Sequence, residues 1–208
     1  MGRRRRWCPP GSMKSCTTLD EAAAAARACT LCAPHLPLGP RPTFRVSSTA
    51  RLLVVGQAPG TKVHATGIPW NDPSGDRLRV WLGMGRDEFY DETRIAIVPA
   101  GFCYPGRLPQ GGDAPPRPEC APKWHPVLLP LLSGLRLTLL VGGYAQALYF
   151  SRGPVGATVA AWREALADQK FPLPHPSWRT IAWERKNPWF GAEVLPALRQ
   201  AVAAALAG

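Results

Sequence analysis

The sequence predicts a three-layer α/β/α sandwich built around a parallel sheet of about four strands. Three observations indicate this fold: short apolar runs alternate with helical patterns, most joins between them are short, and no segment repeats. Alternation of this kind is typical of a parallel sheet with helices on both faces. The 208 residues suffice for one domain with its own core. We expect that domain at 19–208, after a disordered basic arm at 1–18.

Short apolar runs are the predicted strands. A continuous apolar run that is bounded by Gly or Pro and rich in Leu, Ile and Val is typical of a strand buried on both faces. In chain order these runs are 51–56, 94–98, 137–141 and 171–173.

Helical patterns fill much of the chain between the strands. Thr18 or Asp20 can cap the first, Ala-rich helix, and Asp72 or Ser74 can cap the second. The expected helices are 20–27, one that ends near 82, 124–133, one near 144–150, 157–167 and one within 185–207.

Two long loops interrupt this pattern. The first, 57–73, is polar, and the second, 103–122, is rich in Pro and Gly. Loops of such length inside a compact domain are usually functional or tied down.

The chain is strongly basic. Its formal net charge of +11 favours a polyanionic partner such as nucleic acid or a membrane surface. The alternative is an Arg-rich composition that reflects the genome. No apolar run reaches the roughly 18 residues of a membrane span. The run Arg3–Arg6 has no apolar segment after it, so we expect no secretory signal but a solvated arm or one that contacts phosphates.

Two loops of unusual chemistry follow the first and last predicted strands. These are Gly56-Gln57-Ala58-Pro59-Gly60 and Pro174-His175-Pro176-Ser177. The carboxyl ends of parallel strands meet at one edge of a sheet, where ligands bind. A Pro between two glycines holds backbone N–H groups close to a ligand. A neutral imidazole held between prolines can donate a hydrogen bond to a developing oxyanion, or it can simply end a strand.

Cysteines form a pattern of their own. Six cysteines without an export signal favour a metal or cluster site over disulfides. Cys29 and Cys32 are separated by two residues, and Cys103 and Cys120 flank the second long loop. Cys8 and Cys16 lie outside this pattern and are expected to be free.

The two loop motifs resemble those of the uracil-DNA glycosylase superfamily over about residues 22–205. The segment Gly67-Ile68-Pro69-Trp70 is similar to the family segment whose aromatic ring stacks on a flipped base. The resemblance implies a monofunctional enzyme of base excision repair. It hydrolyses the N-glycosidic bond of uracil in DNA by base flipping and leaves an abasic site.

The resemblance also implies roles for individual residues. His175 and backbone N–H groups stabilise the departing uracil anion, and Trp70 stacks on the base. Ser177 contacts a phosphate, and Trp178 or Arg179 fills the gap that the flipped base leaves. The substrate-binding set is completed by Gly56, Ala58, Pro59, Gly60 and Asn71.

Two departures from the family pattern matter for the mechanism. Ala58 stands where the original uracil-DNA glycosylases have an acid, so another group must place the water. We expect Asp72 in that role, with Gln57 as the second candidate and His64 as a third. Asp72 has an alternative role as a helix cap.

Pro99 stands where strict readers of uracil have an Asn, and Pro lacks both an amide and an N–H. Base selection is therefore expected to rest on Asn71, Gln57 or backbone groups. Relaxed selection among deaminated bases remains an alternative.

The cysteine pattern is similar to that of the iron–sulfur branches, families 4 and 5. It implies a structural 4Fe-4S cluster on Cys29, Cys32, Cys103 and Cys120. Such a cluster would hold Arg107 and Arg117 near DNA. A structural Zn ion on the same thiolates is the alternative.

A basic and aromatic stretch at 178–190 follows the last motif. Aromatic planes can wedge into a base stack while Arg and Lys contact phosphates. For Trp189 and Phe190 we expect packing beneath the last helix instead.

These observations predict a monomeric cytoplasmic enzyme that associates with the nucleoid by binding DNA that contains uracil, with no membrane partner. Two rival functions remain open. One is a non-catalytic or relaxed-specificity binder of damaged or single-stranded DNA on the same fold, and the other is a zinc-stabilised RNA-binding module.

Overall fold

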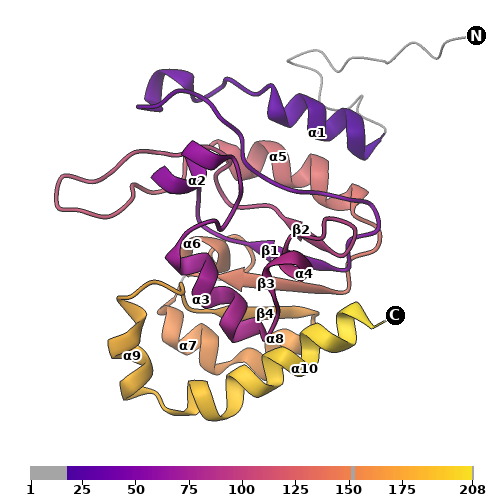
Figure 1. Ribbon diagram of the computed structural model, residues 1–208, viewed down its shortest axis with the longest axis vertical. Coiled ribbons are helices and arrows are strands. Elements are labelled where there is room, and N and C mark those ends of the chain that lie inside the picture. Colours follow the sequence, from indigo (N-terminus) through magenta and orange to yellow (C-terminus); the bar gives the residue numbers. More distant parts are fainter. Residues whose placement is uncertain (1–17, 151–152, 208) are drawn as a thin grey trace, which may run out of the picture.

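A parallel sheet of four strands forms the centre of the molecule (Figure 1). The computed structural model describes residues 18–150 and 153–207, so all of the predicted arm at 1–18 except Thr18 lies outside the described residues. The strands are β1 (Leu52–Val55), β2 (Ile95–Ile97), β3 (Leu137–Val141) and β4 (Lys170–Leu173). Their order is β2-β1-β3-β4, and all neighbours pair in parallel. The predicted fold class is confirmed.

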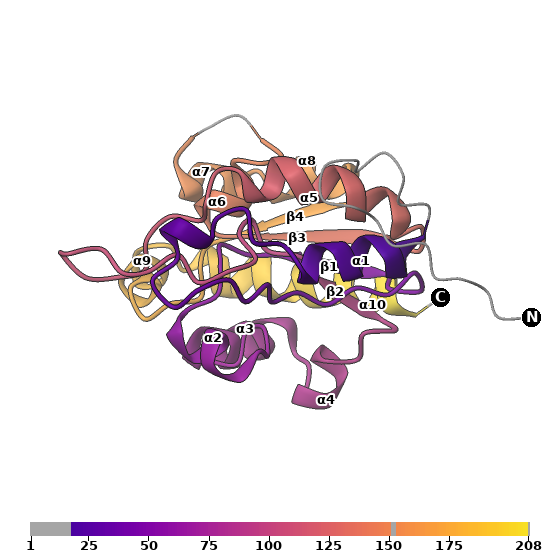
Figure 2. The ribbon, with the colours of Figure 1, turned by 90° about the horizontal axis from the view of Figure 1, so that it is seen from above.

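The sheet separates two apolar cores. Leu52 and Val54 of β1 face a core that includes residues of α3 and α10, while Leu53 and Val55 face a core that includes residues of α1 and α5. Successive side chains of a strand point to opposite faces, so a run that is apolar throughout has both faces covered. Figure 2 shows helices on both sides of the strands.

The first helices begin at local caps. Helix α1 (Leu19–Arg27) starts with a capping box between Thr18 and Glu21. Helix α3 (Pro73–Leu82) starts at Asp72, whose side chain accepts from the Gly75 N–H. The remaining helices are α2 (Thr61–Thr66), α4 (Arg86–Phe89), α5 (Cys120–Leu128), α6 (Gly143–Gln146), α7 (Val155–Ala160), α8 (Trp162–Ala167), α9 (Thr180–Lys186) and α10 (Leu195–Leu206). Short turns lie at Ala33–His35, Leu129–Leu131 and Phe190–Val194.

Several predicted boundaries were wrong. The loop 57–73 contains α2, which starts after Gly60 and ends at Gly67, a glycine with φ of 69°. Such a short helix offers too few turns for a periodic pattern. The helix expected at 124–133 starts at Cys120 and ends at Leu128, before a 3-10 turn, and that expected at 157–167 is broken at Ala161.

The C-terminal segment packs largely as predicted. Phe190 is buried and Trp189 packs against the same core, so their structural role is confirmed. The stretch 178–190 also contains α9, which the sequence analysis missed. Within the described residues, no helix is long and apolar enough to span a membrane.

The chain order of the strands places a crevice at one sheet edge. From β1 the chain moves outward to β2 on one side, and β3 and β4 follow on the other. The order therefore reverses between β1 and β3, and ligands of open α/β sheets bind beyond the carboxyl ends of strands at such a point.

Candidate active site

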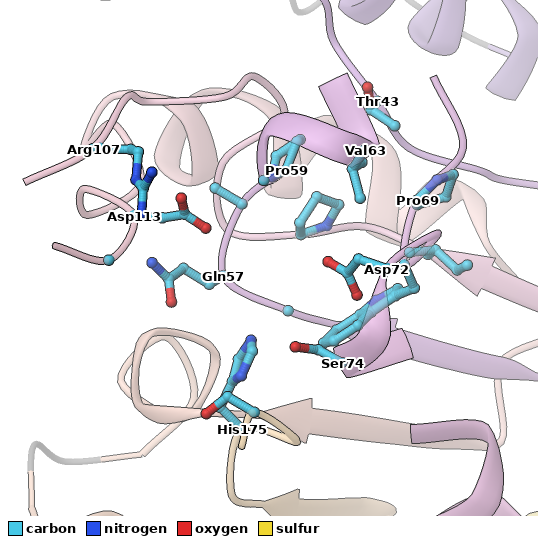
Figure 3. A pocket seen from close by; sticks show the side chains of 18 of the residues that line it. Thr43, Gln57, Pro59, Val63, Pro69, Asp72, Ser74, Arg107, Asp113 and His175 are labelled. Atoms are coloured by element: carbon cyan, nitrogen blue, oxygen red, sulfur yellow. The ribbon is translucent and has the colours of Figure 1, made fainter. Parts of the chain in front are cut away.

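The two loop motifs from opposite ends of the chain meet at a cavity of about 500 Å³ (Figure 3). The loop after β1, the carboxyl end of β2 with Pro99, and the loop after β4 all contribute to its wall. Among the residues predicted for the site, the cavity is lined by Gly56, Gln57, Ala58, Pro59, Gly60, Trp70, Asp72, His175, Ser177, Trp178 and Arg179. The structure thus brings together most of the residues that the motifs indicate.

Trp70 lines this cavity and has a left-handed backbone conformation, with φ of 57°. Its ring lies so close to Gly56 that a Cβ there would be 2.7 Å from the Trp70 Cζ2 atom. The Trp70 and His175 ring centroids are 5.8 Å apart, with the planes tilted by 31°. The glycine of the first motif is therefore needed for the aromatic ring to approach.

Hydrogen bonds from Arg79 and Tyr90, together called the brace, hold the backbone around Trp70. The buried Arg79 donates to the Trp70 carbonyl oxygen at 3.4 Å and pairs with Asp76. The Tyr90 hydroxyl donates to the Pro69 carbonyl oxygen at 2.9 Å. Because a left-handed backbone is costly for a bulky residue, these bonds help to keep Trp70 in place.

The surroundings of His175 favour the neutral form of its ring. Burial lowers the pKa of His175, although the charge of Asp72 acts in the opposite direction. The His175 carbonyl accepts from the Ser177 N–H at 2.8 Å and from the Thr180 hydroxyl. These bonds fix the turn that presents the imidazole, and a neutral imidazole can donate one hydrogen bond.

Asp72 is both a helix cap and a residue of the cavity wall. Its Oδ1 accepts from the Gly75 N–H at 2.8 Å, so the capping role is confirmed. The same carboxylate lines the cavity, and its charge acts on His175. Its role in placing the water stays a prediction.

Two of the candidate residues, Asn71 and His64, do not contribute to the cavity wall. The Asn71 amide donates to the Thr66 hydroxyl at 3.4 Å, and its oxygen accepts from Arg86 at 3.1 Å. Neither Asn71 nor His64 lines the cavity. In the described part of the chain, the buried Nδ1 of His64 has no hydrogen-bond partner.

Pro99 does line the cavity, at the position where the family pattern has an amide. Its carbonyl oxygen accepts from the His125 Nε2 atom at 3.0 Å, which fixes the tautomer of that ring. Burial lowers the pKa of His125. The Pro99 carbonyl oxygen is thus already bonded to His125, which does not line the cavity.

Basic and aromatic side chains surround the mouth. Trp178 is 75% exposed, and the Arg179 guanidinium lies 5.5 Å from its ring centroid. The turn before them is tied down, because Arg77 donates to the Ser177 carbonyl oxygen at 2.8 Å and pairs with Glu184 of α9. Exposed rings and guanidinium groups on a fixed turn suit contact with a nucleic acid.

One carboxylate of this site was not predicted from the sequence. Asp113 lines the cavity together with Arg107, from the loop that follows β2. Although the residue is largely exposed, partial burial and the charge of Asp72 raise the pKa of Asp113, while Arg107 lowers it. The only signal in the sequence was the length and Pro/Gly content of that loop.

The cysteines line a second, smaller cavity. Cys29, Cys32, Cys103 and Cys120 are free thiols around it, together with Leu36, Phe102, Arg117 and Trp124. Burial and neighbouring thiols raise the pKa of Cys103 to about 11 and that of Cys120 to about 12, although both also have a backbone hydrogen bond that acts the other way. Within residues 18–150 and 153–207, no group of three His, Cys, Asp or Glu side chains is arranged to hold a metal ion.

The donor set nonetheless fits an iron–sulfur cluster. Thiolates are the ligands of such clusters, and here the thiols converge on one cavity with apolar walls. A single zinc ion would need them drawn to within about 2.3 Å of one point. Binding of either group would release the thiol protons.

The fold and the larger cavity together define a class of protein. It is a three-layer α/β/α protein with a cavity at the switch point of its sheet, where the Trp70 ring lies beside the His175 imidazole. The family model of the Uracil DNA glycosylase superfamily matches residues 44–199. The match covers most of the chain, and the chain belongs to this superfamily. The superfamily acts on DNA, so DNA is the partner of this chain.

Proposed function

We propose that this protein is a monofunctional DNA glycosylase that removes uracil from DNA and leaves an abasic site. One observation carries the proposal: the Trp70 ring, the His175 imidazole and the glycine-rich loop after β1 line one cavity at the switch point of the sheet. We further propose that it acts as a monomer on nucleoid DNA in the cytoplasm.

The chemistry requires the base to leave the duplex stack. The Trp70 ring offers a plane on which the extruded base stacks. At the mouth, Trp178 fills the gap in the duplex, and the nearby Arg107 and Arg179 contact phosphates. Extrusion costs a few kcal/mol, which these contacts offset.

Cleavage of the glycosidic bond places negative charge on the departing base. His175, neutral and held between two prolines, donates a hydrogen bond to the uracil O2 atom as that charge develops. Backbone N–H groups of the loop 56–60 act on the same charge. A donor preorganised in this way contributes about 10²–10³ to the rate.

Base selection rests on fewer side-chain groups than in strict readers of uracil. Pro99 offers none, and one hydrogen of the Gln57 amide is used by the Ala114 carbonyl oxygen at 3.3 Å. The other amide hydrogen and the oxygen of Gln57 are left to bind and select the base. We therefore propose that uracil is preferred and that other deaminated bases are removed more slowly.

A panel of oligonucleotides tests the function. Each carries uracil, hypoxanthine, xanthine or thymine at one position, in single and double strands. We expect abasic sites from uracil at the highest rate and none from thymine. Tight binding of the damaged strands without any abasic site would show a binding protein instead of a glycosylase.

We propose that the four clustered cysteines hold a structural 4Fe-4S cluster, which would fix the loop between Cys103 and Cys120 beside the cavity. The protein purified without oxygen should then be brown and absorb near about 400 nm, as thiolate-ligated clusters do. Cys103→Ser should abolish this band and lower the melting temperature. Cys8→Ser is the matched control and should change neither. A colourless protein with one equivalent of zinc would contradict the cluster.

A further inference from the structure

A hairpin at 107–113 reaches over the cavity from the loop that follows β2. Arg107 and Asp113 form an isolated antiparallel bridge at its base, and the Leu108 N–H donates to the Gly112 carbonyl oxygen at 3.0 Å. Gly111 and Gly112 make its tight turn, with φ of 90° and 89°. In Figure 1 the loop that contains it projects from the body of the domain beside α2.

The Asp113 carboxylate lies against the glycine-rich loop after β1. A Cβ on Gly60 would be 3.3 Å from the Asp113 Oδ2 atom. Figure 3 shows the Asp113 carboxylate beside Gln57, across the cavity from Asp72. Two carboxylates therefore line the same cavity from different sides.

The segment after Asp113 is held on both sides. The Gln57 amide donates to the Ala114 carbonyl oxygen at 3.3 Å, and the Ala114 N–H donates to the Gly106 carbonyl oxygen at 2.9 Å. These bonds fix the backbone that carries the carboxylate, although Asp113 itself is exposed at the mouth.

The same segment occupies the space beside Ala58. A Cβ on Gly101 would lie 2.9 Å from the Pro116 Cβ and 3.3 Å from the Ala58 Cβ, so both side chains pack around one point. Pro116, three residues after Asp113, therefore lies close to Ala58. The loop beside the expected acidic position thus brings a carboxylate of its own to the cavity.

The carboxylates of Asp72 and Asp113 differ in the hydrogen bonds that they accept. One oxygen of Asp72 is bound by the Gly75 N–H. Among the described residues, no hydrogen bond and no ion pair within 4.0 Å occupies the Asp113 oxygens, although the positive charge of Arg107 is near. The Asp113 carboxylate is therefore the freer of the two to accept a hydrogen bond from water.

We infer that Asp113 is a catalytic residue that binds the attacking water, an inference that rests on the proposed glycosylase function. The water oxygen bonds to C1′ as the bond from C1′ to the base nitrogen breaks. The electron pair of that bond leaves with the base, whose O2 atom is bound by His175. The Asp113 carboxylate takes the proton of the water, and the expelled base anion is later protonated by solvent.

Replacing each carboxylate with its isosteric amide distinguishes the role of Asp113 from that of Asp72. Asp113→Asn should lower single-turnover excision of uracil by about 10²-fold or more, because the amide cannot take the proton. Asp72→Asn keeps an oxygen for the Gly75 N–H and should cause a smaller loss. Asp87→Asn, on the exposed first turn of α4, is the matched control and should keep the wild-type rate.

Two further measurements keep the test decisive. Oligonucleotide affinity and melting temperature of Asp113→Asn should stay near those of the wild type, which excludes misfolding as the cause. Added formate should restore part of the rate of Asp113→Ala, since it supplies the missing carboxylate. A wild-type rate in Asp113→Asn, or a larger loss in Asp72→Asn, overturns the inference while leaving the glycosylase function intact. A wild-type protein that releases no base overturns the proposed function itself.

Discussion

Replacing His175 with alanine or asparagine should lower the excision of uracil by about two orders of magnitude or more, the scale of losing a positioned oxyanion donor. The expectation follows from geometry and charge together. The imidazole lines the cavity beside Trp70. Burial lowers its pKa, so that the neutral ring is available to donate at physiological pH.

The measurement is single-turnover formation of abasic sites in a uracil oligonucleotide, read by alkaline cleavage of the strand. His35→Asn is the matched control, because His35 is exposed on the turn Ala33–His35 and should leave the rate unchanged. Binding of the oligonucleotide should be little affected by either change. An unchanged yield of abasic sites from the His175 variants would contradict the assignment of this cavity as the active site.

The second large effect is expected from Gly75→Ala. A Cβ at this position would lie 1.8 Å from the Trp70 carbonyl oxygen, which is backbone and has no rotamer by which to escape. The first turn of α3 or the backbone of Trp70 must then move. Overpacking of this kind costs about 1–3 kcal/mol or more. The same displacement should move the Trp70 ring off its place and reduce excision.

Thermal unfolding and excision kinetics measured on the same preparation check this prediction. For a chain of this size, the loss of stability corresponds to a fall in melting temperature of roughly 2–4 °C for each kcal/mol. Gly191→Ala is the matched control, since a Cβ there would meet no atom within 4 Å. Equal melting temperatures and rates for the two variants would show that Trp70 does not need the close approach at Gly75.

The brace of Arg79 and Tyr90 shows why Trp70 could be named from its motif but not placed. The pattern Gly-x-Pro-aromatic is local and legible in the sequence. The left-handed backbone of Trp70 depends on Arg79, nine residues further on, and on Tyr90 after the next helix. Such bonds depend on how helix and loop pack, which no periodic pattern records.

For Asn71 and Asp113, too, the position in the sequence did not predict where the side chain lies. Asn71 is adjacent to Trp70 in sequence, yet its amide faces Thr66 and Arg86 outside the cavity. Asp113 lies far in sequence from both loop motifs, yet its carboxylate lies close to Gly60. Adjacency in sequence predicts the direction of a side chain poorly in loops, where no regular repeat assigns alternate residues to one face.

The parallel sheet, the two motif loops and the clustered cysteines could be predicted from the sequence. Continuous apolar runs, Gly and Pro at strand ends, and helix caps act through local backbone preferences, which each segment of sequence shows on its own. Which carboxylates share the cavity, which amide lies outside it, and how Trp70 is held depend instead on tertiary packing. Distances between loops result from the packing of whole elements, because the length and pattern of a loop do not specify where its side chains lie.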